Sequence, residues 1–130
     1  MLTIHPTHIQ QITAHLRACL PNEGCGLVIG NNSIAHEVIP ITNILHSPFQ
    51  FRMDPGELWS ALQQIEAKNQ ALLAVYHSHP ASDCQPSPSD MAEFLYPEAL
   101  MLIISMSGAG EMKAFKIKDG GFEEYPLQLA

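Results

Sequence analysis

The residues with the clearest chemical potential lie between Tyr76 and Asp90, in the stretch YHSHPASDCQPSPSD. His77 and His79 follow an apolar run and are one residue apart, and residues i and i+2 of a strand point to the same face. Pro80 then ends regular strand pairing, and the loop that follows could return the carboxylate of Asp90 to the two imidazoles. Two histidines and an aspartate offer the three N and O ligands of a catalytic zinc site, whose fourth position stays open for water.

A hydrolytic zinc site also needs a base that takes a proton from water and passes it to the leaving group. The candidate is Glu23 in PNEGCGLVIG, at the start of an apolar, glycine-rich run where we find no structural task for a carboxylate. By position alone, a solvated loop residue that follows Pro21 is the favoured interpretation of Glu23, and only the complete motif reverses it. Ser87 could donate a hydrogen bond to a developing oxyanion. Ser87 and Asp90 also form a good helix N-terminus, and a helix cap can fix the position of a ligand.

Taken together, these residues resemble the motif of the JAMM (MPN+) metalloprotease family. Glu23, the run His77-Ser78-His79-Pro80, Ser87 and Asp90 reproduce its pattern E…H-S-H-P…S-x-x-D, including the seven residues between the second histidine and the serine. The segments P-x-E-x-C-G-x-x-x-G and VYHSHP are also similar to those of typical members. The order of the expected helices and strands resembles this family's fold over nearly the whole chain.

The resemblance implies an enzyme, a zinc metalloprotease of the isopeptidase or peptidase type with Zn²⁺ as its cofactor. His77, His79 and Asp90 would bind the zinc. Glu23 would be the general base, and Ser87 would stabilise the tetrahedral intermediate. The bond cleaved in this family typically follows the C-terminal glycine of ubiquitin or a ubiquitin-like protein. The short chain resembles the bacterial stand-alone branch, so the implied partner is a ubiquitin-like or sulfur-carrier protein with a Gly-Gly tail.

Three alternatives compete with this interpretation. A non-catalytic MPN-like scaffold for protein interactions typically lacks one or more of the ligands, whereas this sequence retains all of them. A zinc deaminase needs P-C-x-x-C, and the sequence contains no CxxC. Cys84 could be a fourth ligand that closes the site, but we expect a buried or redox-active thiol there.

The expected helices place the candidate residues at element ends. A first helix should begin at a capping box formed by Thr7 and Gln10 and end before Pro21. A second should begin at Asp54, and a third at Ser87, directly beside the candidate ligand Asp90.

The apolar runs predict a sheet. The segment 71–77 is continuously apolar, which is typical of a central strand buried on both faces. An Asn-Asn turn should join the first two strands in a hairpin, and SGAG and DGG turns should separate the last three. The expected strands cover residues 24–30, 33–41, 49–53, 71–77, 99–106, 111–117 and 122–127. We therefore predict an α/β fold, a single-domain mixed β-sheet flanked by helices; the resemblance implies a JAMM/MPN-like (cytidine deaminase-like) architecture.

Composition narrows the class of protein. With 130 residues, 46% of them hydrophobic and 15% charged, we expect one globular domain covering residues 1–130. The formal charge of −7 and the absence of any Lys/Arg cluster argue against a nucleic-acid partner. No apolar run is long enough to span a membrane, and no secretory signal is visible. The three cysteines do not suggest a disulfide framework, so we expect a cytoplasmic protein; its oligomeric state is left open.

Overall fold

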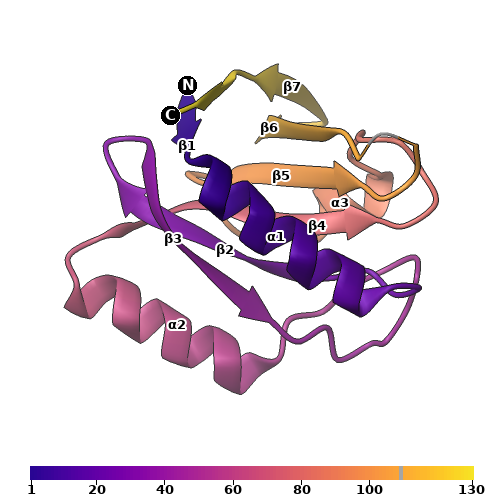
Figure 1. Ribbon diagram of the computed structural model, residues 1–130, viewed down its shortest axis with the longest axis horizontal. Coiled ribbons are helices and arrows are strands. Elements are labelled where there is room, and N and C mark those ends of the chain that lie inside the picture. The colour runs from indigo at the N-terminus through magenta and orange to yellow at the C-terminus, as the bar shows by residue number, and fades with distance from the viewer. Residues whose placement is uncertain (109) are drawn as a thin grey trace.

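The computed structural model describes residues 1–108 and 110–130, which form a mixed β-sheet flanked by helices, as predicted (Figure 1). Ala109, in the predicted SGAG turn, lies outside the described residues. None of the helices in the described ranges is long and apolar enough to cross a membrane. The elements follow in the order β1 (Leu2–Ile4), α1 (Pro6–Cys19), β2 (Cys25–Asn31), β3 (Ile34–Ile41), α2 (Pro55–Ala67), β4 (Ala71–His79), α3 (Pro88–Ala92), β5 (Leu100–Ser105), β6 (Met112–Lys118), β7 (Gly121–Tyr125) and β8 (Leu127–Leu129).

The strand that carries both candidate histidines lies in the middle of the sheet. The strand order among the described residues is β7-β6-β5-β4-β2-β3-β1-β8. β4 pairs antiparallel with β2 and parallel with β5, so the carboxyl ends of β4 and β5 meet at one edge of the sheet. The apolar run of β4 is buried from Ala74 onward, which confirms the prediction of a central strand. A polar side chain at the end of β4 is therefore presented by a rigid element.

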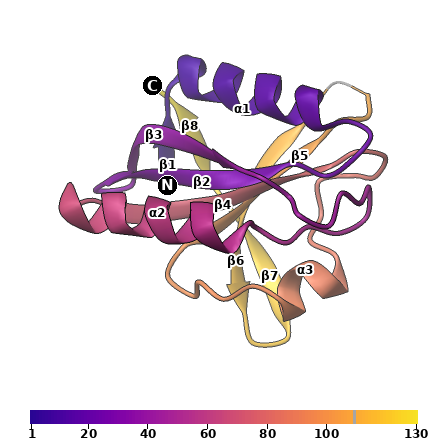
Figure 2. The ribbon, with the colours of Figure 1, turned by 90° about the horizontal axis from the view of Figure 1, so that it is seen from below.

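The helices lie on both faces of the sheet. Figure 2 shows α1 on one side, and α2 and α3 on the other. Ile12 and Leu16 of α1 belong to the same core cluster as Tyr76 of β4. Ala61 and Ile65 of α2 belong to a second cluster on the opposite face. Successive residues of β4 thus alternate between the two layers, and His77 shares the α2 face.

Two of the three predicted helix starts are confirmed. Asp54 caps α2, with its carboxylate accepting a hydrogen bond from the N–H of Glu57 at 3.0 Å, and Ser87 caps α3. The capping box at Thr7 is wrong, because α1 begins earlier. His5 is the N-cap, and its Nδ1 accepts from the N–H of Thr7 at 3.3 Å. Pro6 at the first helical position requires no hydrogen-bond partner, which explains the earlier start.

The strand predictions hold for the central sheet and fail at its margins. β2 and β3 form the expected hairpin, but the predicted Asn-Asn turn is wrong by one residue: Asn31 pairs with Ile34 at the end of β2, and Asn32 and Ser33 form the turn in the left-handed region. Segment 49–53 is not a strand, since only a single bridge joins Met53 to Asn43. β1 was not expected, and Pro126 divides the last predicted strand into β7 and β8. Strands this short receive their pairing from neighbours that are distant in the sequence, so their own residues carry little signal.

Candidate metal and active site

The end of β4 presents His77 and His79 on one face of the sheet. Ser78, between them, points to the other face, where its Oγ accepts a hydrogen bond from the N–H of Gly24 at 2.9 Å. The N–H of Ser78 donates in turn to the carbonyl of Gly24 at 3.1 Å. This exchange extends the pairing of Cys25 with His77 by one residue. The sequence H-S-H therefore supplies two aligned imidazoles and one hydroxyl that joins β4 to the chain entering β2.

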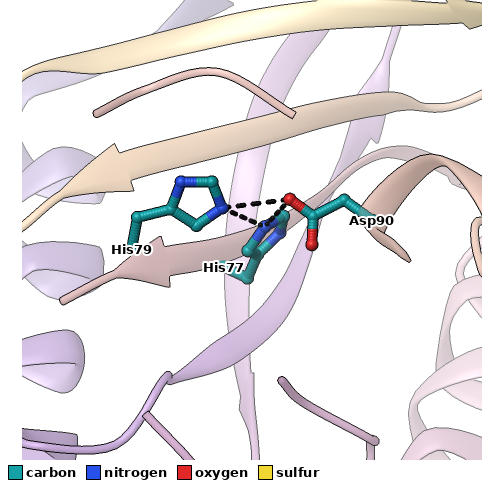
Figure 3. Close-up of side chains that lie close together, drawn as sticks. All are labelled: His77, His79 and Asp90. Atoms are coloured by element: carbon teal, nitrogen blue, oxygen red, sulfur yellow. Dashed lines mark hydrogen bonds and ion pairs between the residues drawn. The ribbon is translucent and has the colours of Figure 1, made fainter. Parts of the chain in front are cut away.

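The two imidazoles and the carboxylate of Asp90 converge on one point (Figure 3). Oδ2 of Asp90 lies 3.1 Å from Nε2 of His77 and 3.0 Å from Nε2 of His79. The two Nε2 atoms are 3.3 Å apart. Both histidines are buried, at 1% and 5% exposure. Within the described part of the chain, these three residues are the group of ligand atoms compact enough to hold a metal ion.

The loop between β4 and α3 orients His79. Nδ1 of His79 donates to the backbone carbonyl of Asp83 at 2.7 Å, which turns Nε2 toward Asp90. Two hydrogen bonds hold this loop against the end of β5 and the chain that enters β6. Ser105 Oγ donates to the carbonyl of Ser82 at 2.7 Å, and the thiol of Cys84 donates to the carbonyl of Glu111 at 2.7 Å. The hydrogen bond from Nδ1 of His79 to the carbonyl of Asp83 is the kind that a metal-ligating histidine usually makes through its second ring nitrogen.

The turn into α3 fixes Asp90. The N–H of Asp90 donates to Ser87 Oγ at 3.0 Å, and the N–H of Ser87 donates to Asp90 Oδ2 at 2.9 Å. Burial alone would raise the pKa of the Asp90 carboxyl, but the hydrogen bonds from His77 and His79 outweigh it and hold that pKa well below its usual range. Asp90 is therefore ionised. The capping role and the ligand geometry coexist in one side chain, as the sequence suggested.

The electrostatics of the two histidines differ. Burial lowers the pKa of His77, which favours the neutral imidazole that binds metal ions. Burial also acts to lower the pKa of His79, but hydrogen bonds to Asp90 and to the carbonyl of Asp83 raise it above its usual value. Uptake of a metal ion at these atoms therefore requires the release of a proton from this cluster.

The donor set fits a divalent cation such as zinc. Two imidazole nitrogens and one carboxylate oxygen leave a coordination position open in a tetrahedral site. Oε1 of Glu23, which approaches this cluster, is buried and has no hydrogen-bond partner among the described residues. Buried polar atoms are nearly always paired, so an unpaired carboxylate oxygen next to a convergent ligand set fits a polar centre that a further polar species completes.

Glu23 lies beside this centre. Cys25 is paired with His77, so Glu23, two residues earlier, approaches on the same face of the sheet, opposite His79. Its side chain is 4% exposed. Burial raises the pKa of the Glu23 carboxyl to about 8, and the negative charge of Asp90 adds to this rise while His79 opposes it. The interpretation of Glu23 as a solvated loop residue is wrong, and a carboxyl with this pKa can both accept and donate a proton near neutral pH.

Glu23 makes the stability of the metal-free protein depend on pH. The pKa of its carboxyl is about 8 in the folded protein against an ordinary value of 4.5, so the folded state binds more protons between these pH values. The free energy of unfolding should therefore fall as the pH rises through this window. We expect Glu23→Gln to stabilise the metal-free protein, with a gap from the native chain that widens by about 3 kcal/mol between about pH 5 and pH 8.

Urea unfolding of both proteins in the presence of a chelator measures this difference. Glu66→Gln, at an exposed position of α2, is the matched control for the loss of one carboxylate at the surface. A Glu23→Gln protein whose stability follows that of the native chain across the range would contradict the assigned environment.

An apolar pocket of about 480 Å³ opens beside His77 and Asp90. Segment 42–54, which we call the pocket loop, forms one wall, and its Phe51 ring stacks on His77 with the ring centroids 4.8 Å apart. Phe94 and Tyr96, after α3, line the other side. Sequence reasoning missed this wall because it assigned residues 49–53 to a strand. Phe51 of FQFRM was the available signal, as an aromatic residue in a polar loop is a candidate for ligand contact.

Cys84 does not belong to the cluster of His77, His79 and Asp90. Its thiol is buried at 1% exposure and bonds to the carbonyl of Glu111. This confirms the expectation of a buried thiol, and the alternative of a fourth ligand is wrong. Cys25 instead donates to the carbonyl of Ile41, so the two thiols do not pair; all three cysteines are free.

Comparison with known proteins gives several relatives of similar length. The chain is 29% identical to the CysO-cysteine peptidase of Mycobacterium bovis over 99% of this chain and 91% of that protein. It is 34% identical to a probable TtuB-protein conjugate cleaving protease of Thermus thermophilus, over 86% of this chain and 73% of that protein. It is 30% identical to a desampylase of Pyrococcus furiosus, over 89% of this chain and 81% of that protein.

Solved structures and a family model agree with these relatives. A protein from Desulfitobacterium hafniense superimposes with a TM-score of 0.90 at 33% identity, covering 100% of this chain and 93% of that one. A structure described as a JAMM metalloprotease-like zinc site of the proteasome and signalosome shares the fold, with a TM-score of 0.63 at 19% identity over 100% of this chain and 98% of that one. The model of prokaryotic homologs of the JAB domain matches residues 5–118. The chain therefore belongs to the prokaryotic JAB-domain family, the JAMM (MPN+) group that its motif resembles.

Proposed function

We propose that this protein is a zinc-dependent peptidase or isopeptidase that hydrolyses the bond after the C-terminal glycine of a ubiquitin-like protein, with sulfur-carrier proteins included in that class. The observation that carries the proposal is the convergence of His77, His79 and Asp90 beside the buried Glu23. The choice of substrate is supported by the names of three relatives. They are a CysO-cysteine peptidase, a probable TtuB-protein conjugate cleaving protease and a desampylase.

His77, His79 and Asp90 would hold the zinc through Nε2, Nε2 and Oδ2. When bound, zinc supplies a Lewis acid that polarises a carbonyl group and makes water a stronger acid. Glu23 would then accept the proton of the attacking water and deliver it to the leaving amine. The positive charge of the cation opposes the rise in the pKa of Glu23 that burial produces, which favours the ionised, proton-accepting form.

Ser87 would donate its hydroxyl hydrogen to the oxyanion of the tetrahedral intermediate. Its Oγ already accepts from the N–H of Asp90, and this bond leaves the hydroxyl hydrogen available for a second partner. Oγ of Ser89 lies 3.1 Å away and can receive that hydrogen when substrate is absent. The same turn thus anchors a metal ligand and a hydrogen-bond donor on one rigid segment.

We expect Ser87→Ala to lower kcat by about 10²–10³-fold, because one oxyanion donor is lost. The substitution also removes the N-cap of α3, which costs about 1 kcal/mol of stability. Steady-state kinetics and thermal unfolding separate the two effects. Ser87→Thr keeps both the cap and the hydroxyl and should retain most of the rate, whereas an equal loss in the alanine and threonine variants would contradict the donor role.

The proposal also includes the cellular location and the domain organisation of the protein. We place the protein in the cytoplasm as a single JAMM/MPN+ domain of residues 1–130. The support is that all three cysteines are free thiols, as reducing compartments require.

Metal removal tests the proposal directly. The substrate is a ubiquitin-like protein fused through its Gly-Gly tail to a reporter, and the control substrate ends in Gly-Pro before the reporter. We expect cleavage by the zinc-loaded protein, loss of cleavage after chelation and recovery with one equivalent of Zn²⁺. If the loaded protein binds the ubiquitin-like partner but leaves the fusion intact, the non-catalytic scaffold is the correct alternative.

A further inference from the structure

Asn43 joins Glu23 to the pocket loop. Its side chain is 8% exposed, and every hydrogen-bonding position on it is used. Nδ2 donates to the carbonyl oxygens of Glu23 at 3.0 Å and Gln50 at 3.1 Å. Oδ1 accepts from the backbone N–H groups of Leu45 and Arg52, both at 3.0 Å. An asparagine amide has two donor hydrogens and two acceptor lone pairs, so this side chain is fully satisfied.

The backbone of Glu23 is held by the pocket loop on both sides. Its N–H donates to the carbonyl of Ser47 at 2.9 Å, and its carbonyl accepts from Asn43. The next residue, Gly24, bonds instead to Ser78 of β4. Glu23 is therefore the residue at which the chain passes from contacts with the pocket loop to contacts with the sheet.

Side-chain hydrogen bonds contribute little to the position of the Glu23 carboxylate. Oε1 has no hydrogen-bond partner among the described residues, although it is buried. The backbone therefore determines where the carboxylate lies relative to the metal-binding group. The next residue, Gly24, packs closely on α1, since a Cβ atom there would lie 2.7 Å from Leu16 and 2.9 Å from the sulfur of Cys19. Movement of Glu23 is thus limited on one side by α1 and on the other by Asn43.

We propose that Asn43 is a positioning residue that fixes Glu23 relative to the metal-binding group and, through the same amide, fixes the wall of the apolar pocket. The inference rests on the proposed function, because the group that Asn43 positions is the proposed base. The amide of Asn43 has a donor role and an acceptor role. Its donor hydrogens hold the carbonyls of Glu23 and Gln50, and its acceptor oxygen holds the N–H groups of Leu45 and Arg52.

The variants Asn43→Asp and Asn43→Ala separate these roles. Aspartate keeps the acceptor bonds to Leu45 and Arg52 but cannot donate to the carbonyls of Glu23 and Gln50, both of which it repels. We expect Asn43→Asp to lower kcat by about 10–100-fold, since a displacement of about 1 Å can cost this much, and to raise KM less than Asn43→Ala does, since the acceptor bonds still hold the pocket loop. Alanine loses both roles and should lower kcat and raise KM together. Asn22→Ala, beside Glu23 but without a side-chain hydrogen bond in the described part of the chain, is the matched control.

A double-mutant cycle with Glu23→Gln tests the route of the effect. If Asn43 acts through Glu23, Asn43→Asp should cause no further loss of kcat in the Glu23→Gln background. The zinc affinity of Asn43→Asp should equal that of the native protein. Losses that multiply in the double mutant, native turnover in Asn43→Asp, or a parallel fall in zinc affinity would each overturn the inference. If Glu23→Gln itself is fully active, the proposed base fails, and this result is distinct from a failure of Asn43 alone.

The native protein provides a test that does not depend on the variants folding. Both Nδ2 hydrogens of Asn43 are donated inside the protein, so NMR should show slow exchange with solvent for this side-chain amide. The exposed Asn32 offers the comparison. Exchange of the Asn43 amide as fast as that of Asn32 would overturn the proposal.

Discussion

Glu23→Gln is expected to reduce the rate of hydrolysis of a Gly-Gly fusion by about 10²–10⁴-fold while zinc stays bound. Glutamine has nearly the same shape as glutamate but cannot accept a proton from water. The carboxylate is buried beside Asp90 and His79, whose charges act on it, so no exposed acid can replace it readily. Single-turnover kinetics, with the zinc content measured in the same samples, test this prediction.

The matched control for this substitution is Glu66→Gln on the exposed face of α2, which should leave the rate unchanged. Activity of Glu23→Gln close to the native value would exclude Glu23 as the base, whether or not zinc is present. A loss of rate together with a loss of zinc would instead place Glu23 among the groups that support metal binding.

The second large effect concerns the proposed metal ligands His77, His79 and Asp90. We expect Asp90→Asn to lower zinc affinity by more than the roughly 10–100-fold that the loss of an outer partner costs, because a direct anionic ligand is removed. Asp90 also accepts from His77, His79 and the N–H of Ser87 through one oxygen. The uncharged amide of asparagine accepts hydrogen bonds from these donors, and binds a cation, more weakly than the carboxylate of Asp90 does. Competition with a chromophoric chelator measures the change in affinity.

Asp83→Asn is the matched control for Asp90. Only the backbone carbonyl of Asp83 contacts His79, so a change in its exposed side chain preserves that hydrogen bond. We expect native zinc affinity in this variant. Equal affinity in Asp90→Asn and the native protein would show that the cluster of His77, His79 and Asp90 is not the zinc site.

Local patterns predicted much of the fold. Continuous apolar composition identified β4, and Asp54 and Ser87 identified the starts of α2 and α3, because strand burial and helix capping depend on neighbouring residues. The same locality explains the failures. β1 pairs with β3 and β8, and the start of α1 depends on a histidine that is an unusual N-cap. Such features are decided by partners that residue-by-residue patterns do not reveal.

By itself, the sequence determined the chemical types at the site. The i, i+2 spacing of His77 and His79 on a strand and the return of Asp90 after a loop of suitable length already predicted a three-ligand group. Ser87, as the residue that caps α3, was part of the same local pattern.

Only the tertiary structure decided how Glu23 is used. Pairing of β2 with β4 brings it beside histidines more than fifty residues away, and burial there raises the pKa of its carboxyl to about 8. The same applies to Asn43, whose amide links Glu23 to the pocket loop. Spacing in a sequence specifies neighbours along one element, whereas desolvation and hydrogen bonds between segments depend on which elements pack together.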